Sequence, residues 1–210
     1  MTAPGSACEP TRELGRSFVL ASSSPRRRAL LAQIGLVPHL ILSPAVDETP
    51  RRDENPRLYA ERLARAKAAA GSETIRADPD HDPETLILAA DTVVALGRRI
   101  LPKAEDEATA RRCLGLLSGR RHRVITAVML MHPHGMSERV VESVVAFSRM
   151  TPRQIDALIA AGDWQGKAGG YAVQGHAAAF VRFLSGSYSN VVGLPLFETA
   201  QLLRGHGALI

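Results

Sequence analysis

The chain has 210 residues, and its formal net charge of +5 corresponds to a pI near 9.8. Hydrophobic residues make up 45% of it and charged residues 22%, a balance typical of globular proteins. No apolar run approaches the roughly 20 residues that a membrane helix needs, so we expect no membrane partner. Residues 1–16 lack the apolar segment of a secretory signal, and we expect a flexible tail there, followed by a single domain over residues 17–210.

The basic composition favours a polyanionic partner. Aromatic residues make up only 4% of the chain, too few for the stacking platforms of proteins that bind single-stranded nucleic acid. A small phosphorylated ligand therefore fits better than nucleic acid. The two cysteines, Cys8 and Cys113, lack metal-ligand spacing and predict free thiols in a reducing compartment, which points to the cytoplasm.

Apolar, β-rich runs alternate with helical patterns along the chain. Strands are expected at Phe18–Ala21, Leu40–Leu42, Leu86–Ala90, Val124–Met131, Val140–Phe147 and Phe180–Leu184. Helices are expected at Pro25–Ile34, Pro56–Ala70, Glu105–Leu117, Pro152–Ala161 and Pro195–Leu203. This interleaving predicts an α/β fold with a mixed sheet. The turn residues at 132–135 predict an antiparallel hairpin between the fourth and fifth strands.

The segment between the first strand and the first helix carries three serines, a proline and three arginines. Ser24 is the expected N-cap and Pro25 the first helical residue. A helix N-terminus attracts anions, whereas arginines in the first turn are unfavourable unless a negative partner offsets them. A bound polyphosphate would be such a partner. The alternative is a solvated, basic helix start.

The second expected helix places a lysine in line with an apolar row. Tyr59, Leu63 and Lys67 are spaced four residues apart and fall on one face. Such a lysine either snorkels to the solvent or reaches into a site, and the spacing by itself favours snorkelling. If Lys67 is a site cation among other cations, its removal should leave stability unchanged or slightly higher.

Asp91 directly follows the apolar run Leu86–Ala90, and a second apolar run begins after it. We expect the strand to end at this aspartate. A carboxylate in that setting is costly unless it is paired or bound to a metal, and strand ends are where α/β sites gather. The alternative is a turn or cap aspartate.

A glycine-rich segment, Gly166–Gly175, follows later in the chain and should allow close approach of the backbone to a ligand. Within it, Lys167 could balance phosphate charge and Gln174 could read a base edge. The alternative is a surface loop, and the segment does not match a P-loop. Glu48 and Lys103 lie in other loops, and together these groups resemble a metal–triphosphate site.

Five segments in order resemble motifs of the Maf family of nucleoside triphosphate pyrophosphatases. They are Leu20–Arg27, Ala90–Val94, Leu117–Ala127, Lys167–Gly175 and Val192–Leu196. The resemblance runs from about residue 18 to residue 203. It implies a strongly curved mixed sheet with flanking helices and two lobes around a central cleft, related to the inosine triphosphatases. It also implies hydrolysis of a nucleoside triphosphate to the monophosphate and pyrophosphate with Mg²⁺ or Mn²⁺, in a nucleotide house-cleaning role.

The resemblance implies a role for each matching residue. Asp91 matches the proton acceptor and, with Glu48, a metal ligand. The implied substrate contacts are Ser22, Arg26, Arg27, Lys67, Thr92, Lys103, Lys167 and Gln174. Among these, Arg26, Thr92 and Gln174 match the positions that separate the subfamilies and point to the branch acting on dTTP and UTP.

Some positions depart from the family pattern. Gly166 stands where an aspartate is common, and Pro102–Ala104 stands where Gly-Lys-Pro is common. Asp47–Pro50 also resembles the branch acting on 7-methyl-GTP. These departures bear on the substrate more than on the reaction.

Two other functions stay open, and so does a homodimer. One is a non-enzymatic nucleic-acid-binding or cell-division protein, which the basic pI and the family's link to septum formation permit. The other is a purine-directed triphosphate pyrophosphatase. A binding protein should spread its cations along a surface, whereas an enzyme should converge them on Asp91.

Overall fold

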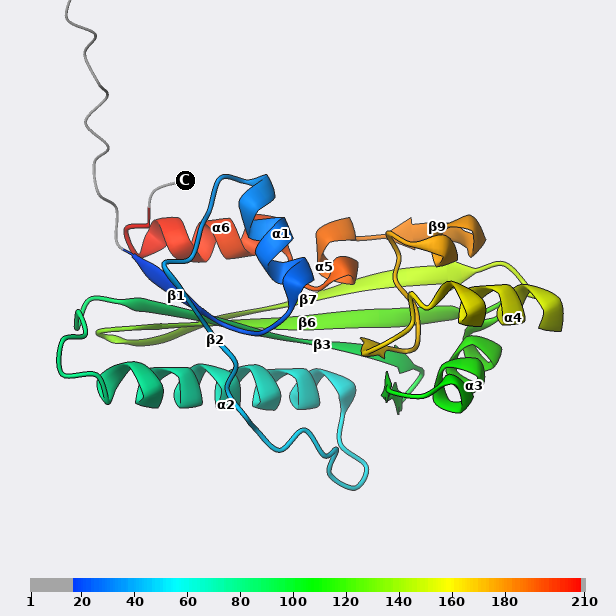
Figure 1. Cartoon of the computed structure of the whole chain (residues 1–210), viewed down its shortest axis with the longest axis horizontal. Coiled ribbons are helices and arrows are strands. Elements are labelled where there is room, and N and C mark those ends of the chain that lie inside the picture. Colours follow the sequence, from blue (N-terminus) through cyan, green and yellow to red (C-terminus); the bar gives the residue numbers. More distant parts are fainter. Residues whose placement is uncertain (1–16, 209–210) are drawn as a thin grey trace, which may run out of the picture.

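A seven-stranded mixed sheet forms the centre of the computed structural model, which describes residues 17–208 (Figure 1). Its strands are β1 (Phe18–Ala21), β2 (Leu40–Leu42), β3 (Leu86–Leu96), β4 (Arg99–Leu101), β6 (Arg121–His132), β7 (Gly135–Phe147) and β9 (Val181–Ser185). The order is β2-β1-β3-β6-β7-β9, and β4 pairs with β3. β1 is parallel to β2 and β3, whereas the other pairs are antiparallel. A separate pair joins β5 (Lys103–Ala104) to β8 (Lys167–Ala168).

Helices cover both faces of this sheet. They are α1 (Pro25–Gln33), α2 (Pro56–Arg76), α3 (Glu107–Leu117), α4 (Pro152–Ala161), α5 (Tyr188–Val192) and α6 (Leu196–Gly205), with a 3-10 helix at His176–Phe180. Figure 1 shows α2 along one face and α1, α5 and α6 over the other, while α3 and α4 lie at one end. The expected α/β fold with a mixed sheet and flanking helices is confirmed.

The sequence pattern explains why both faces are covered. Successive residues of a strand point to opposite faces, and in the first part of β3 both sets are apolar. Leu88 and Ala90 face a core shared with α1 and α6, whereas Ile87 and Ala89 face a core shared with α2. A third apolar cluster packs around α3 and α4 at the end of the sheet.

The expected end of β3 at Asp91 is wrong. The strand continues to Leu96, and its antiparallel ladder with β6 runs unbroken through Asp91↔Ala127 to Ala95↔Arg123. After the aspartate, Val93 and Val94 point to opposite faces of the sheet, and both are buried. The carboxylate therefore projects from the middle of a central strand.

Other expectations about the elements are confirmed. The hairpin of β6 and β7 turns at 133–134, with His132 opposite Gly135. α4 has the predicted bounds, and its N-cap Thr151 forms a capping box. Ser24 is the N-cap of α1, although its side chain makes no capping hydrogen bond. Cys113 is a buried free thiol, whereas Cys8 and the expected tail over residues 1–16 lie outside the described residues.

No helix within residues 17–208 has both the length and the apolar character needed to cross a membrane.

α2 approaches the sheet closely at Gly71. A Cβ added there would lie 2.9 Å from Ala21 Cβ and 3.2 Å from Ile87 Cγ2, both on the sheet face that α2 covers. Gly115 in α3 is the contrasting case, because nothing lies within 4 Å of its added Cβ. The missing side chain thus sets the distance between α2 and the sheet.

We expect Gly71→Ala and Gly115→Ala to change stability in opposite directions. Alanine is favoured over glycine in a helix by about 1 kcal/mol, so Gly115→Ala should raise the free energy of unfolding by up to that amount. At Gly71 the steric overlap costs about 1–3 kcal/mol and should outweigh that gain. Urea unfolding of both variants measures the two signs, and a stabilised Gly71→Ala would contradict the close contact.

Candidate active site

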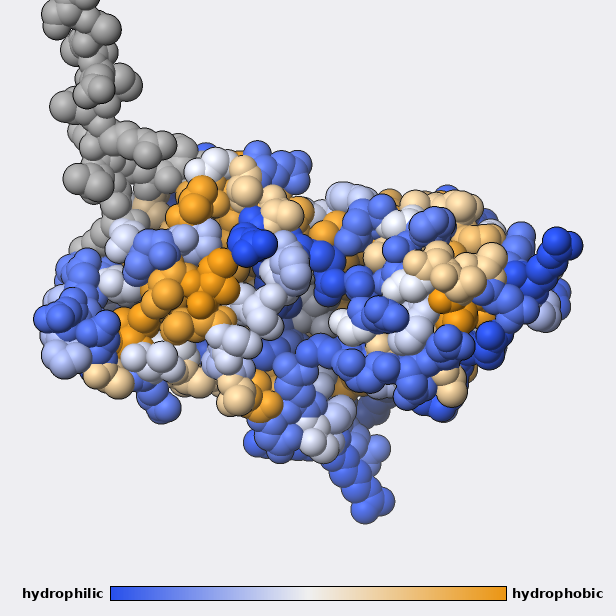
Figure 2. Space-filling model, viewed as in Figure 1, coloured by the Kyte–Doolittle hydropathy of each residue, from blue (hydrophilic) through white to orange (hydrophobic). Residues whose placement is uncertain are grey.

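One cavity of about 470 Å³ brings all ten predicted site residues together. Its lining includes Ser22, Arg26, Arg27, Glu48, Lys67, Asp91, Thr92, Lys103, Lys167 and Gln174. These residues come from the β1–α1 turn, the first turn of α1, the segment after β2, α2, β3, β5 and the segment from β8 onward. Figure 2 shows this face of the molecule hollowed near its centre, with hydrophilic residues around the hollow.

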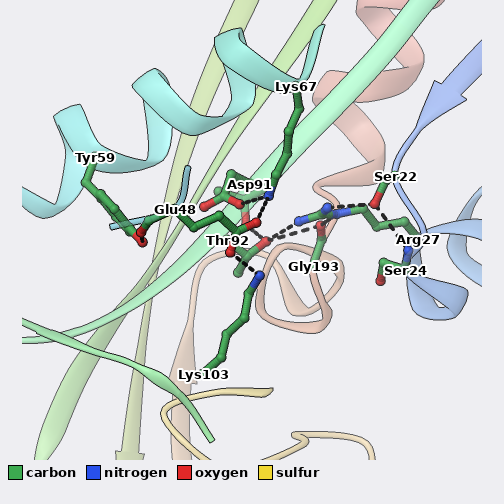
Figure 3. Close-up of polar contacts among 11 residues, drawn as sticks. Ser22, Ser24, Arg27, Glu48, Tyr59, Lys67, Asp91, Thr92, Lys103 and Gly193 are labelled. Carbon is green, nitrogen blue, oxygen red and sulfur yellow. Dashed lines mark hydrogen bonds and ion pairs between the residues drawn. The ribbon is translucent and has the colours of Figure 1, made fainter. Parts of the chain in front are cut away.

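Lys67 lies buried between two carboxylates (Figure 3). Its Nζ is 2.6 Å from Asp91 Oδ1 and 2.6 Å from Glu48 Oε1. Asp91 is only 4% exposed and Lys67 only 8%. Burial at this depth excludes the snorkelling alternative, because a snorkelling lysine keeps its ammonium group in water.

Glu48 belongs to the irregular segment after β2, and lysines hold both of its carboxylate oxygens. Lys103 pairs with Oε2 while Lys67 pairs with Oε1. Partial burial alone would raise the pKa of Glu48, but the hydrogen bonds from Lys103 and Lys67 outweigh it and the pKa lies below the usual value. Glu48 is therefore an anion at neutral pH.

Arg27 turns inward from the first turn of α1, and protein oxygens surround its guanidinium. Nε donates to the carbonyl of Gly193 at 2.8 Å, and the two terminal nitrogens donate to Ser22 Oγ at 2.9 Å and Thr92 Oγ1 at 3.1 Å. Thr92 Oγ1 also lies 3.0 Å from Thr126 Oγ1, which is fully buried. Hydroxyl and carbonyl dipoles thus replace the water that burial removes from this arginine.

Arg26 and Lys167 also line the cavity, where Lys167 Nζ donates to the carbonyl of Gln165 at 2.8 Å. Burial lowers the pKa of Arg26. Burial and the charge of Arg26 together lower the pKa of Lys167, against a smaller opposing effect from Asp163. In total, five cationic side chains and two carboxylates line the cavity, so positive charges exceed negative ones by three. The cavity is therefore suited to a polyanion.

The glycines after β8 have a different role from the one expected. Gly169 and Gly170 have φ of +70° and +69°, and an added Cβ would lie 2.9 Å from Val94 Cγ1 and 3.1 Å from Ala110 Cα, respectively. They approach β3 and α3, so the expected approach to a ligand is wrong at these two positions. Gly166 has open space around it, and Gln174 is exposed where it lines the cavity.

Sequence reasoning missed two residues that complete the site. The carbonyl of Gly193 accepts hydrogen bonds from Arg27 and from Thr92 Oγ1. Gly193 lies in a segment that resembles a family motif, but every residue has a backbone carbonyl, so the residue type does not indicate that this one accepts hydrogen bonds. Tyr171 lines the cavity, and its hydroxyl lies 2.8 Å from Nε2 of the buried His122. Burial raises the pKa of Tyr171 and lowers that of His122 to about 4, so both are neutral at pH 7.

The described part of the chain holds no group of three or more His, Cys, Asp or Glu arranged for a metal ion. Glu48 and Asp91 nevertheless converge on one cation, the ammonium of Lys67. Mg²⁺ typically takes one or two carboxylates, with phosphate oxygens and water completing its coordination. The two carboxylates therefore fit a divalent ion that arrives with a phosphorylated ligand.

The geometry overturns the expectation that losing the Lys67 charge leaves stability unchanged or higher. Lys67 sits between two anions and not among cations. We expect Lys67→Met to lower the free energy of unfolding at pH 7 by about 2–4 kcal/mol, because it leaves the buried Asp91 without its ion-pair partner and close to the negative charge of Glu48, which keeps its pair with Lys103. Adding Asp91→Asn should recover part of this loss.

Arg65→Met is the matched control on the same helix, because Arg65 pairs with Glu138 at the surface. It should change the free energy of unfolding by less than about 1 kcal/mol. Urea unfolding at pH 7 measures all three variants. A Lys67→Met protein as stable as the wild type would contradict the buried ion pair.

Known proteins resemble this chain along most of its length. The model of a family described as Maf-like protein matches residues 17–206. A dTTP/UTP pyrophosphatase of Granulibacter bethesdensis is 61% identical and aligns over 90% of this chain and 93% of its own length. Those of Gluconobacter oxydans and Rhodospirillum rubrum are 59% and 60% identical, over 97% and 94% of this chain and 92% of each relative.

A crystal structure of a nucleoside-triphosphatase, a dITP/XTP pyrophosphatase from Mycobacterium abscessus, is more distant. Its TM-score is 0.39 and its identity 21%, over 64% of this chain and 74% of that one. The family match and the high identity to the three bacterial relatives show that this chain belongs to the Maf-like protein family.

Proposed function

We propose that this protein hydrolyses nucleoside triphosphates to the monophosphate and pyrophosphate, with dTTP and UTP or their modified forms as preferred substrates. The observation that carries the proposal is the convergence of five cations on two carboxylates in one cavity. The substrate preference rests on the relatives, which are named dTTP/UTP pyrophosphatases, and on Arg26, Thr92 and Gln174.

We further propose that the activity belongs to a single domain over residues 17–210 and serves to clear unwanted nucleotides in the cytoplasm. The free thiol of the buried Cys113 agrees with a reducing compartment.

The cationic side chains would bind and orient the triphosphate. Within residues 17–208, Arg26 and Lys167 form no ion pair with a carboxylate, so phosphate oxygens would take that place. Arg27 is already fixed by Ser22, Thr92 and the Gly193 carbonyl, and a charge held in advance needs little reorganisation when phosphate charge develops.

The hydrolytic step needs a base beside the reacting phosphorus. Asp91 would accept a proton from a water molecule while the water oxygen bonds to the α-phosphorus. The bond from that phosphorus to the oxygen bridging to the β-phosphate breaks, and pyrophosphate leaves with its electron pair. Lys67 would hold the carboxylate of Asp91 in place. Mg²⁺ or Mn²⁺ bound by Asp91 and Glu48 would neutralise phosphate charge.

The alternative of a non-enzymatic nucleic-acid-binding or division protein is less well supported. Such a protein would lay cations along an exposed surface, whereas here Lys67 and Arg27 are buried beside Asp91. A purine-directed pyrophosphatase would use the same catalytic groups, so the nucleotide panel below decides between the two enzymes.

We expect Asp91→Asn to fold and to lose most activity. An essential general base contributes about 10²–10⁴-fold to the rate. Pyrophosphate release from UTP measures the loss, and circular dichroism checks the fold. Glu142→Gln is the control, because this carboxylate of β7 pairs with Arg123 outside the cavity and should keep wild-type turnover. If Asp91→Asn retains more than about a tenth of that turnover, Asp91 is not the base.

A nucleotide panel tests the substrate proposal. With Mg²⁺ or Mn²⁺, dTTP and UTP should give higher kcat/KM than GTP, ITP or 7-methyl-GTP, and the first product should be pyrophosphate. Preference for 7-methyl-GTP would match the second resemblance of Asp47–Pro50 and refute the proposed branch. Release of orthophosphate as the first product would refute the reaction.

A further inference from the structure

Residues 43–55 carry Glu48 into the cavity without any helix or strand of their own. They connect β2 to the start of α2, and Figure 1 shows the segment projecting past α2. A segment of this length has many conformations, so specific contacts must hold Glu48 in place. The contacts come from one face of α2.

Tyr59 holds the backbone of Glu48. Its hydroxyl donates to the carbonyl oxygen of Glu48 at 2.6 Å (Figure 3). The tyrosine ring is buried in the apolar cluster between α2 and the sheet. Burial, with the charges of Asp91 and Glu48, raises the pKa of Tyr59 to about 12, so the hydroxyl remains a donor at neutral pH.

Arg62 holds the part of the segment that follows Glu48. Its Nε and a terminal nitrogen donate to Glu54 Oε1 at 2.7 Å and Oε2 at 2.8 Å, and the same terminal nitrogen lies 3.1 Å from the carbonyl oxygen of Thr49. Glu54 Oε2 also accepts from the backbone N–H of Arg51 at 2.9 Å. The hydrogen bonds from Arg62 hold the pKa of Glu54 down at about 2, against a smaller effect of burial, so the ion pair persists at neutral pH.

These contacts fix the backbone at Glu48 and the part of the segment that follows it. We propose that Tyr59 is a positioning residue for the proposed reaction: its hydroxyl fixes the backbone of Glu48, so that the carboxylate lies between Lys67 and Lys103, and Arg62 with Glu54 holds the adjoining segment. The inference rests on the proposed function for its kinetic consequence, while the positioning itself is independent of turnover.

The test is a double-mutant cycle between Tyr59→Phe and Glu48→Gln. Tyr59→Phe removes one oxygen and keeps the buried ring. Misplacement of a binding group by about 1 Å can cost about 100-fold, so we expect kcat/KM for UTP to fall by about 10- to 100-fold. In the Glu48→Gln background, Tyr59→Phe should cause no further loss, because the residue acts through the Glu48 carboxylate.

Stability gives a contrasting readout in the same variants. The acceptor of the Tyr59 hydrogen bond is a backbone carbonyl, which Glu48→Gln leaves in place. Tyr59→Phe should therefore lower the melting temperature equally in both backgrounds. A purely structural Tyr59 would instead reduce activity by the same factor with or without the Glu48 carboxylate.

Ligand binding separates this inference from the proposed function. Titration calorimetry with Mn²⁺ in the presence of pyrophosphate should show weaker binding in Tyr59→Phe, and no additional weakening when it is combined with Glu48→Gln. If the wild-type protein binds Mn²⁺ with pyrophosphate more tightly than Tyr59→Phe but hydrolyses no triphosphate, the proposed function is refuted and the positioning role of Tyr59 remains.

Tyr188→Phe is the matched control, because Tyr188 is 51% exposed in α5 and does not line the cavity. It should leave kinetics and binding unchanged. Wild-type kinetics and Mn²⁺ binding in Tyr59→Phe would overturn the inference, and so would an equal loss in both backgrounds of the cycle.

Discussion

The rest of the site depends on one buried interaction, the ammonium of Lys67 held at 2.6 Å from both Asp91 and Glu48. Two carboxylates this close would repel each other, and an ammonium alone at this depth would be costly to bury. The three groups come from a helix, a central strand and an irregular segment. The ammonium therefore ties these parts together. One negative charge of the three remains, and Lys103 offsets it at Glu48. Removal of Lys67 would leave Asp91 without its ion-pair partner.

Two other cations of the cavity, Arg26 and Lys167, differ from Lys67 in their surroundings. Burial lowers the pKa of Arg26, and burial together with the charge of Arg26 lowers the pKa of Lys167. In the described part of the chain, neither side chain forms an ion pair with a carboxylate. Repulsion of this kind costs stability in the ligand-free protein and is relieved when a polyanion binds. A cavity in which positive charges exceed negative ones by three is therefore suited to a polyanion, whose binding would relieve this repulsion.

The local sequence pattern predicts the helices and strands well, but it does not predict the contacts between segments that are distant in the chain. The bounds of α4 and the β6–β7 hairpin follow from capping and turn residues that act within a few positions of one another. Asp91 was misplaced at a strand end because a buried carboxylate resembles an interruption when its partner, Lys67, is not known. The contact of Gly169 with Val94 joins distant segments, so the sequence showed the glycine without showing what it approaches. Seven of the ten proposed site residues lie in the five family motifs, and the resemblance implies the other three, Glu48, Lys67 and Lys103. Such a resemblance carries long-range information that local propensity lacks.

Periodicity also left the depth of Lys67 undecided, and the reason lies in the packing of α2. Spacing fixes the face on which a lysine lies but not how near that face comes to the sheet. Gly71, one turn after Lys67 on the same face, permits an approach at which an added Cβ would lie 2.9 Å from Ala21 Cβ.

The alignment of α2 with β3 then places Lys67 at Asp91. On β3, Ile87 lies beneath Gly71, and Asp91 is four residues further along the same strand face. The contact that brings Gly71 against Ile87 therefore also brings Lys67 to Asp91, while Tyr59 on the same row reaches Glu48. One face of α2 therefore positions both the sheet and the site. Gly71 sets the distance between the helix and the sheet, and Lys67 pairs with Asp91 and Glu48. Tyr59 holds the segment that supplies Glu48.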